Sequence, residues 1–344
     1  EALVRAGYAS PVPPIDPIEP ARYWDTRDEP TVDGSFRDTG RLAGATAFTV
    51  QVSGRSDIPV GAKAVVANLT VVDPDQAGFA TLYACTAEAP VASHLNFAEG
   101  DVLANSVVVP LNADGELCVH TSATADFALD IGGVIPADSP LVTIDPARFL
   151  DTRDVPGFHT FDRASEAGGQ VSAGTVLEVP IGGRGDVPAD AQAALINVTA
   201  VDPAGDGYLT VFPCGDQPSA STVNYLAGQV VPNGAVAALS GTGTVCIFAL
   251  TTTDVLVDVS GFVPAGATGL STVAPARLLD TRPGGTTIDD VSSGDGRVAP
   301  DGFIEVQVAG RADVPDGAAA AIVNLVVVDP DGPGFVTLYP CGDV

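Results

Sequence analysis

The stretch NLTVVDP at residues 68–74 decides the fold, because it returns as NVTAVDP at 197–203 and as NLVVVDP at 324–330. Each copy is a short run of apolar and β-branched residues that ends in an Asp-Pro turn, which is typical of a β-strand. Around it the same motifs return in the same order, at offsets of 126 to 129 residues. They are ARYWDTR, ARFLDTR and ARLLDTR, then GRSDIP, GRGDVP and GRADVP, and then GFATLYAC, GYLTVFPC and GFVTLYPC. The chain is therefore a tandem array of three related repeats.

The motif order sets the domain boundaries. We expect a first repeat at 21–135, a second at 143–264, and the first half of a third at 272–344. Residues 1–20 are rich in Pro and match no repeat, so they are interpreted as a leader or linker. The joints between repeats are short, so adjacent units should sit nearly end to end.

Each repeat has the pattern of an all-β domain. Short runs rich in Val, Thr, Leu and aromatic residues are separated by Asp-Pro and Gly-rich turns, and no window holds a 3.6-residue period. About seven or eight such strands per repeat fit a β-sandwich, while a barrel remains possible. The sequence therefore predicts tandem, bead-like β-sandwich domains. The Asn that opens each NxTVVDP-like strand (Asn68, Asn197 and Asn324) is expected to tie down backbone groups within its own sheet.

Charge excludes two classes of partner. The 43 acidic and 15 basic residues leave a net charge of −28, which would be repelled by nucleic-acid phosphates and by anionic lipid. No apolar run approaches the roughly 20 residues of a membrane-spanning helix. The chain contains no Met and begins with Glu1, which indicates either a removed signal peptide or trimming.

The cysteines recur with the repeats. Cys85 and Cys118 occupy the same positions in the first repeat as Cys214 and Cys246 in the second. Their separation of roughly 32 residues predicts one disulfide per repeat, which would stabilise each unit by about 3–4 kcal/mol. A metal site is the alternative, but no further ligand recurs nearby. Disulfides indicate an oxidising, extracellular compartment. Cys341 has no mate in this chain, and either a truncated continuation or a second chain would supply it.

Arginine and aspartate recur at fixed positions in all three repeats. Two interpretations stay open: a structural clamp that locks loops to the sandwich rim, or a ligand pocket in which Arg and Asp grip a sugar or a carboxylate. Among these residues, Arg27, Arg153 and Arg282 are predicted to be largely buried clamps between the DTR motif and the body of their own unit. The recurring residues are Arg22, Asp25, Arg27, Arg55, Asp57, Arg148, Asp151, Arg153, Arg184, Asp186, Arg277, Asp280, Arg282, Arg311 and Asp313.

Neither a cofactor nor a catalytic site is expected. The acidic turns at 73–75 and 329–332 could hold Ca²⁺, which binds six to eight oxygens, but the second copy reads Asp202-Pro203-Ala204. Calcium is therefore not a property of every repeat. The three histidines have no counterparts in register with a nucleophile and an acid, so hydrolytic triad chemistry finds no support.

The motifs PARFLDTR (146–153), NVTAVDPAGDGYLTVFPCG (197–215) and STVNYLAGQVVPN (221–233) carry a family resemblance. The chain resembles, over about residues 19–344, the PARLLDTR-type tandem repeats of secreted and cell-surface proteins from high-GC Gram-positive (actinobacterial) bacteria. Such repeats also occur beside cell-wall hydrolase modules. The resemblance implies a secreted, cell-surface location and assigns no catalytic residue.

Two functional hypotheses follow. The first is an extracellular structural or adhesive protein, a stalk, fibre or surface-appendage subunit, whose partners are copies of itself or other surface proteins. The alternative is an array of carbohydrate- or cell-wall-binding modules that targets an attached hydrolase, with one weak site per repeat adding to avidity. Sugar binding favours exposed aromatic platforms, whereas the strand pattern predicts that Tyr83, Phe97, Tyr208 and Tyr225 are mostly buried. Neither hypothesis makes the chain itself an enzyme.

Overall fold

The computed structural model describes residues 13–90, 92–332, 334–339 and 341. Its strands all lie between residues 16 and 263 and form four antiparallel sheets, and no helix occurs in the described ranges. Those ranges accordingly hold no candidate for a membrane-spanning helix. The predicted all-β class, with tandem sandwich-like domains, is confirmed.

Each complete repeat contributes eight strands in the same order. The first repeat contains β1 (Asp16–Asp25), β2 (Thr46–Gln51), β3 (Ala64–Val72), β4 (Gly78–Tyr83), β5 (Leu95–Phe97), β6 (Val102–Pro110), β7 (Glu116–Thr121) and β8 (Asp126–Ile135). The second contains β9 (Val142–Asp151), β10 (Thr175–Pro180), β11 (Ala193–Val201), β12 (Gly207–Pro213), β13 (Val223–Tyr225), β14 (Val230–Ala238), β15 (Thr244–Ala249) and β16 (Asp254–Val263).

Two four-stranded sheets enclose the core of each repeat. In the first repeat they have the strand orders β1-β8-β3-β6 and β2-β7-β4-β5, and the second repeat repeats both orders as β9-β16-β11-β14 and β10-β15-β12-β13. Side chains of β3 alternate between buried and half-buried, as expected when one face of a strand packs on a core. Trp24 and Phe127 lie in the core of the first repeat, while Ile196 and Ile247 lie in that of the second.

Strand pairing links the two halves of each repeat. Strands β1 to β4 pair only with β5 to β8, and β9 to β12 pair only with β13 to β16. The first four strands of a repeat therefore have no hydrogen-bonding partners among themselves. Every pair of hydrogen-bonded strands joins one strand of the first half to one strand of the second half, so each half needs the other to form a sheet.

The third repeat illustrates this dependence. Its described residues carry all the first-half motifs, yet they contain no strand, and an isolated bridge joins Asp280 to Ser293. The copy of the NLTVVDP stretch exposes its apolar side chains, and Phe335 is 94% exposed. The sequence pattern for strands is present, but without a partner the backbone groups have no ladder to join.

The first repeat begins earlier than expected. Strand β1 starts at Asp16, which pairs with Val134 of β8, and Pro17 pairs with Gly133. Residues 16–20 therefore belong to the sandwich and not to the proposed leader. The register shifts after Pro17, and this irregularity, together with the prolines, hides the strand from pattern analysis.

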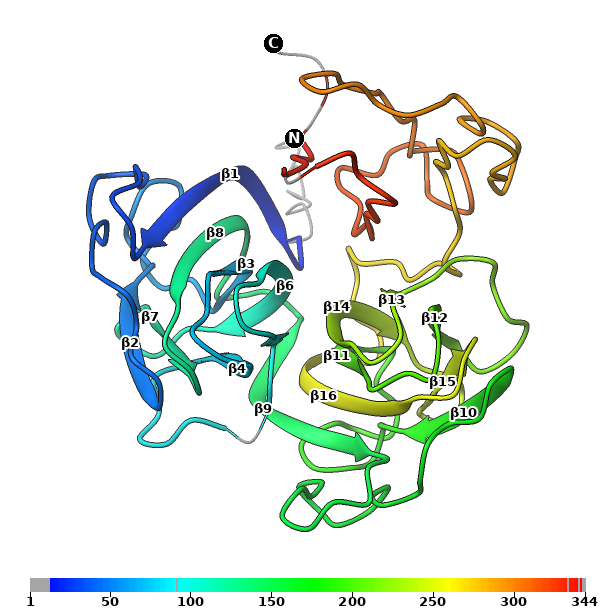
Figure 1. Ribbon diagram of the computed structural model, residues 1–344, viewed down its shortest axis with the longest axis horizontal. Coiled ribbons are helices and arrows are strands. Elements are labelled where there is room, and N and C mark those ends of the chain that lie inside the picture. The colour runs from blue at the N-terminus through cyan, green and yellow to red at the C-terminus, as the bar shows by residue number, and fades with distance from the viewer. Residues whose placement is uncertain (1–12, 91, 333, 340, 342–344) are drawn as a thin grey trace, which may run out of the picture.

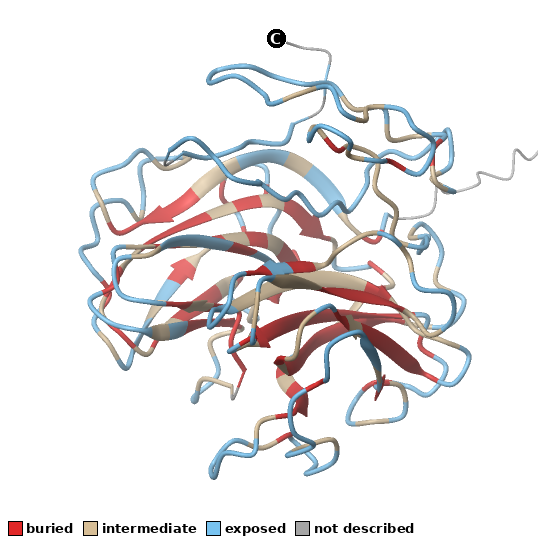
Figure 2. Ribbon diagram, turned by 45° about the vertical axis from the view of Figure 1, so that its right-hand side comes forward, coloured by how far each residue is buried: buried red, intermediate tan, exposed pale blue. Residues whose placement is uncertain are grey.

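The repeats lie side by side around a common centre, with the third repeat next to β1 (Figure 1). Figure 2 shows that the buried residues, in red, are concentrated on the strands in the interior, while most connecting loops are exposed, in pale blue. A small apolar cluster joins the first two repeats through Ala64, Ile135, Leu141 and Leu195. The short joints thus permit lateral packing, which differs from the expected end-to-end arrangement.

Candidate functional site

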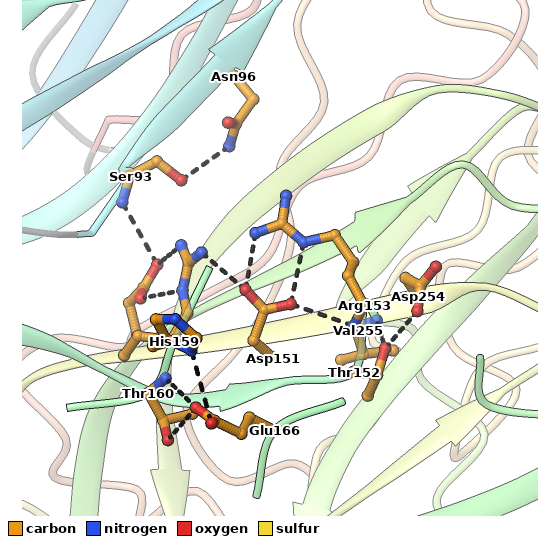
Figure 3. Close-up of polar contacts among 12 residues, drawn as sticks. Ser93, Asn96, Asp151, Thr152, Arg153, His159, Thr160, Glu166, Asp254 and Val255 are labelled. Carbon is orange, nitrogen blue, oxygen red and sulfur yellow. Dashed lines mark hydrogen bonds and ion pairs between the residues drawn. The ribbon is translucent and has the colours of Figure 1, made fainter. Parts of the chain in front are cut away.

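A buried aspartate at the end of the first strand receives two arginines. In the second repeat, Arg153 donates to Asp151 from Nε at 2.9 Å and from Nη2 at 2.7 Å, and its backbone N–H donates at 3.1 Å. Figure 3 shows this fork of Arg153 on Asp151. Arg148 adds a bond from Nη1 at 3.2 Å. The equivalent sets are Asp25 with Arg27 and Arg22, and Asp280 with Arg282 and Arg277.

Arg148 also connects this aspartate to the neighbouring strand. Its Nε and Nη2 donate to the two carboxylate oxygens of Asp258 in β16, at 2.9 and 3.0 Å. The guanidinium therefore bridges Asp151 of its own strand and Asp258 of β16, which ties β9 to β16. Arg22 makes the same forked contact with Asp130. Bidentate contacts of this kind hold the geometry of a strand end.

Opposite charges outweigh burial in this network. Burial opposes the charge of Arg148, but Asp258 and Asp151 more than offset it and raise the pKa of the guanidinium. Burial likewise opposes ionisation of Asp151, but the bonds and charges of Arg153 and Arg148 hold the pKa of this carboxyl below its usual value. In the third repeat, the hydrogen bond from Arg282 lowers the pKa of Asp280 to about 2.

The DTR arginines are less buried than predicted. The side chains of Arg27, Arg153 and Arg282 are 36%, 18% and 52% exposed. The expectation of largely buried clamps is wrong for Arg282 and overstated for Arg27. Each guanidinium folds back onto the aspartate two residues earlier, so the carboxylate faces the interior and the arginine covers it from the solvent side. The buried partner is thus the aspartate.

A second arginine set uses partners that the sequence analysis missed. Arg55 donates from Nε and Nη2 to the carboxylate of Asp33, at 2.8 and 2.7 Å, and from Nη1 to the carbonyls of Tyr23 and Gln51. Arg184 with Asp162, and Arg311 with Asp289, repeat this contact at the same sequence separation of 22 residues. A recurring Thr-x-Asp at that spacing is the signal that could have identified these partners.

The aspartates next to these arginines in sequence do not pair with them. Asp57, Asp186 and Asp313 are exposed, and none forms an ion pair with a described residue. Each lies two residues after its arginine, in a turn where neighbouring residues have positive φ. That turn directs the aspartate to solvent while the arginine reaches inward.

The acidic turns proposed for calcium hold an arginine. In the first repeat Arg41 forms ion pairs with Asp73, Asp75 and Asp126, at 3.7, 2.7 and 3.1 Å. In the third repeat Arg297 pairs with the corresponding Asp329 and Asp331.

The second repeat has Gln170 and Ala204 at the positions of Arg41 and Asp75. The arginine and one of its three carboxylate partners are therefore absent together, while Asp202 and Asp254 remain. No group of three or more potential metal ligands occurs among the described residues.

Both predicted disulfides are present. Cys85 joins Cys118, and Cys214 joins Cys246, with Cα atoms 4.9 Å apart in each pair. Each bond links the residue just after one strand to the neighbouring strand of the same sheet, β4 to β7 in sheet β2-β7-β4-β5 and β12 to β15 in sheet β10-β15-β12-β13. Cys341 is exposed and is not disulfide-bonded to any described residue.

Two asparagines form the contact between the first and second repeats. Asn105 of β6 donates from Nδ2 to Oδ1 of Asn197 in β11, at 2.9 Å. Asn197 donates in return to the carbonyl of Ser93, at 2.6 Å. The N–H of Gly234 in β14 donates to Oδ1 of Asn105, at 3.0 Å. These groups are buried, so each bond replaces a lost bond to water.

The contact between the second and third repeats has the same design. Asn233 of β14 donates to Oδ1 of Asn324, at 3.0 Å, and Asn324 donates to the carbonyl of Ser221, at 3.0 Å. Asn197 and Asn324 thus bond to the preceding repeat. The expectation that they tie down their own sheet is wrong for both, because their side chains leave the sandwich on its outer face.

The repeats surround a central cavity of about 540 Å³. Residues of all three repeats line it, and the five asparagines of the repeated contact lie on its walls: Asn68, Asn105, Asn197, Asn233 and Asn324.

His94 also lines this cavity. Its Nδ1 accepts the N–H of Leu82 at 3.0 Å, and burial lowers its pKa to about 4 although the charge of Asp258 opposes this. Thr222, at the equivalent position, accepts the N–H of Val211 in the same way. In both repeats, the side chain at this position accepts a hydrogen bond from a backbone N–H of β4 or β12.

Comparisons with known proteins add little about function. No family model matches the chain, and no curated protein matches it. One solved structure similar to part of the chain is the N-terminal CBM22-1-CBM22-2 tandem domain from Paenibacillus barcinonensis Xyn10C. The match has 12% sequence identity and a TM-score of 0.18, and it covers 74% of this chain and 100% of that chain. A likeness at this level supports no conclusion about activity or ligand.

Proposed function

We propose that this chain is an extracellular structural or adhesive protein, in which repeats joined side by side form a rigid block at a cell surface. The observation that carries the proposal is the reuse of one polar contact between successive repeats. Asn105 with Asn197, and Asn233 with Asn324, make the same amide pair. A contact that recurs at each junction fixes the orientation of neighbours, which a load-bearing or scaffolding array requires.

The use of charge supports the same proposal. All nine recurring arginines form ion pairs with carboxylates of their own repeat. A binding site for an acidic or hydroxylated ligand would instead present an arginine with free donors. Because the arginines are engaged internally, most of the surface charge is acidic.

The disulfides and the sequence resemblance support the location. Disulfides persist in oxidising compartments, and the repeats resemble those of actinobacterial surface proteins. We propose that the partners are copies of the same chain or other surface proteins, and that the chain has no catalytic role.

Bead clustering tests the proposal. Beads coated with the purified chain should cluster, and clustering should increase between low salt and about 150 mM salt, because screening reduces repulsion between surfaces of net charge −28. Beads coated with a globular protein of similar acidity provide the control. If coated beads stay dispersed at every salt concentration while the same protein binds a glycan array with saturation, the structural proposal is overturned.

Carbohydrate binding is the second candidate, and one cleft favours it. A cavity of about 330 Å³ in the second repeat has apolar walls from Leu150, Val171 and Val176 and polar groups from Glu166 and Glu178. This combination of an apolar wall and a few polar groups suits a sugar ring. Saturable glycan binding that is lost in both Glu166→Gln and Glu178→Gln would favour this candidate.

None of the four strand aromatics considered for a sugar platform is exposed, although Phe158 and Phe161 in a loop of the second repeat are each 45% exposed. Tyr83, Phe97 and Tyr225 are buried, as the strand pattern predicts, and Tyr208 packs against Phe248 with ring centroids 5.9 Å apart. This burial favours the structural proposal over carbohydrate binding.

A further inference from the structure

Among the described residues, one face of the first repeat lacks the neighbour that the equivalent faces of the other repeats have. Asn68 occupies the position of Asn197 and Asn324. Among the described residues its side chain forms a single hydrogen bond, accepted from Ser106 Oγ of its own sheet at 3.1 Å. Its counterparts each reach an asparagine and a carbonyl of the preceding repeat. The docking groups of the repeated contact are therefore present on the first repeat without a partner.

Differences in exposure show what a neighbour covers. The Arg22–Asp130 pair of the first repeat and the Arg148–Asp258 pair of the second have the same forked geometry. The side chains of Arg22 and Asp130 are 30% and 28% exposed, whereas those of Arg148 and Asp258 are 7% and 1% exposed. The first repeat covers the second pair, and the N–H of Ser93 contacts Asp258 Oδ2 at 3.4 Å.

The described residues of the third repeat carry first-half motifs and no second-half strand. The strands that pair with the first-half segments of a repeat all belong to its second half. In the third repeat those segments remain unpaired and expose the apolar side chains Ile322, Val323, Leu325, Val326, Val327, Val328, Phe335, Val336 and Leu338. Clusters of exposed apolar side chains mark sites of interaction.

The unpartnered face of the first repeat and the unpaired segments of the third both line the central cavity. Its walls include Val66 and Asn68 from the first repeat, and Asn324 and Leu338 from the third. Figure 1 shows the red part of the third repeat beside the start of β1. A single segment placed there can contact both.

We propose that this combined surface binds the second half of a repeat, a segment with the motif order of residues 218–265, so that three repeats close into a ring. Its strands pair with the first-half segments of the third repeat. The asparagine at the position of Asn233 bonds to Asn68, and a backbone N–H at the position of Ser93 meets Asp130. The ring then contains three copies of one contact around the asparagine-lined cavity, and this assembly does not depend on the proposed function.

Extension of the full chain tests the proposal. Residues 218–265 are appended after Val344, which is equivalent to Gln217. Asn68→Cys is then combined with replacement of the appended copy of Asn233 by cysteine. The pair Asn105→Cys with Asn197→Cys, at the contact already described, is the positive control. Asn68→Cys with replacement of the appended copy of Thr242, an exposed turn residue, is the negative control.

We expect the Asn68 pair to form a disulfide as readily as the positive control. Its yield should exceed that of the negative control about ten-fold, because a specific contact raises the effective concentration of the two thiols. Peptide mapping should also find the appended copy of Cys246 joined to Cys341. If that bond forms while the Asn68 pair cross-links no better than the negative control, ring closure is overturned.

A second measurement covers failure of the extended chain to fold. The same segment is added as a separate polypeptide to the full chain, and hydrogen exchange is followed at residues 64–72 and 321–330. Slower exchange in both ranges supports the proposal. Unchanged exchange in both ranges, together with the absence of the Cys341 bond in the extended chain, overturns it.

Discussion

Replacing Asp151 by asparagine should destabilise the second repeat severely. The carboxylate has no exposed surface and accepts four hydrogen bonds from Arg148 and Arg153. Asp151→Asn removes the charge while Arg148, 7% exposed, stays buried with Asp258 as its one ionic partner. Breaking a buried pair in this way costs about 3–5 kcal/mol.

Asp25→Asn is the matched control in the first repeat. The carboxylate of Asp25 is equally inaccessible, but Arg22 is 30% exposed and can turn to water. The expected loss is therefore smaller, about 1–3 kcal/mol. Arg153→Ala should also cost less than Asp151→Asn, because Arg153 is partly exposed and Arg148 continues to neutralise Asp151.

Hydrogen exchange with mass spectrometry, followed as a function of urea concentration, measures the free energy of unfolding of each repeat in both full-length variants. Peptides from β16 report on the second repeat and peptides from β8 on the first. The predicted result is a larger loss at β16 in Asp151→Asn than at β8 in Asp25→Asn. Equal losses in the two variants would refute the argument that coverage by the first repeat makes the Arg148 network harder to break.

Three further predictions concern the disulfides, His94 and the repeat contact. Removing the second disulfide with Cys214→Ser and Cys246→Ser should lower the stability of that repeat by about 3–4 kcal/mol and leave its fold intact, which calorimetry and circular dichroism would show; complete unfolding would contradict it. Because burial lowers the pKa of His94 to about 4, the unfolded chain binds this proton at higher pH. The free energy of unfolding should therefore be highest above about pH 6.5 and should fall by about 3 kcal/mol as the pH falls to 4. Urea titrations at each pH measure this dependence, and it should be weaker in His94→Thr. Asn197→Ala leaves the buried carbonyl of Ser93 without its hydrogen-bond donor. It should accelerate hydrogen exchange at residues 92–97 several-fold more than Asn324→Ala does at residues 220–225, because Asn324 is exposed. Equal acceleration would show that burial of the contact does not matter.

Repetition is the reason that much of the fold could be predicted from sequence. Three copies of one motif order align the strands and the cysteines, so the Cys85–Cys118 and Cys214–Cys246 bonds follow without knowledge of the fold. The third copy places Cys341 at the position of Cys85 and Cys214, and it forms no disulfide with any described residue.

Contacts between distant residues were harder to predict. Asp57 is close to Arg55 in sequence, but the turn between them directs Asp57 outward, and Asp33, 22 residues away, is the partner. The lateral packing was missed because Asn197 has the pattern of an ordinary strand residue. Nothing in its own repeat shows that its amide bonds to Ser93, a residue 104 positions earlier.

Small-angle X-ray scattering of the full chain distinguishes side-by-side packing of the repeats from an end-to-end string. A compact chain of 344 residues should have a radius of gyration of about 20 Å. Separate repeats of the same size joined end to end would give about 30 Å. We expect a radius of gyration close to that of the compact chain, and we expect it to be the same at low and high salt. A value near that of the extended string would contradict it.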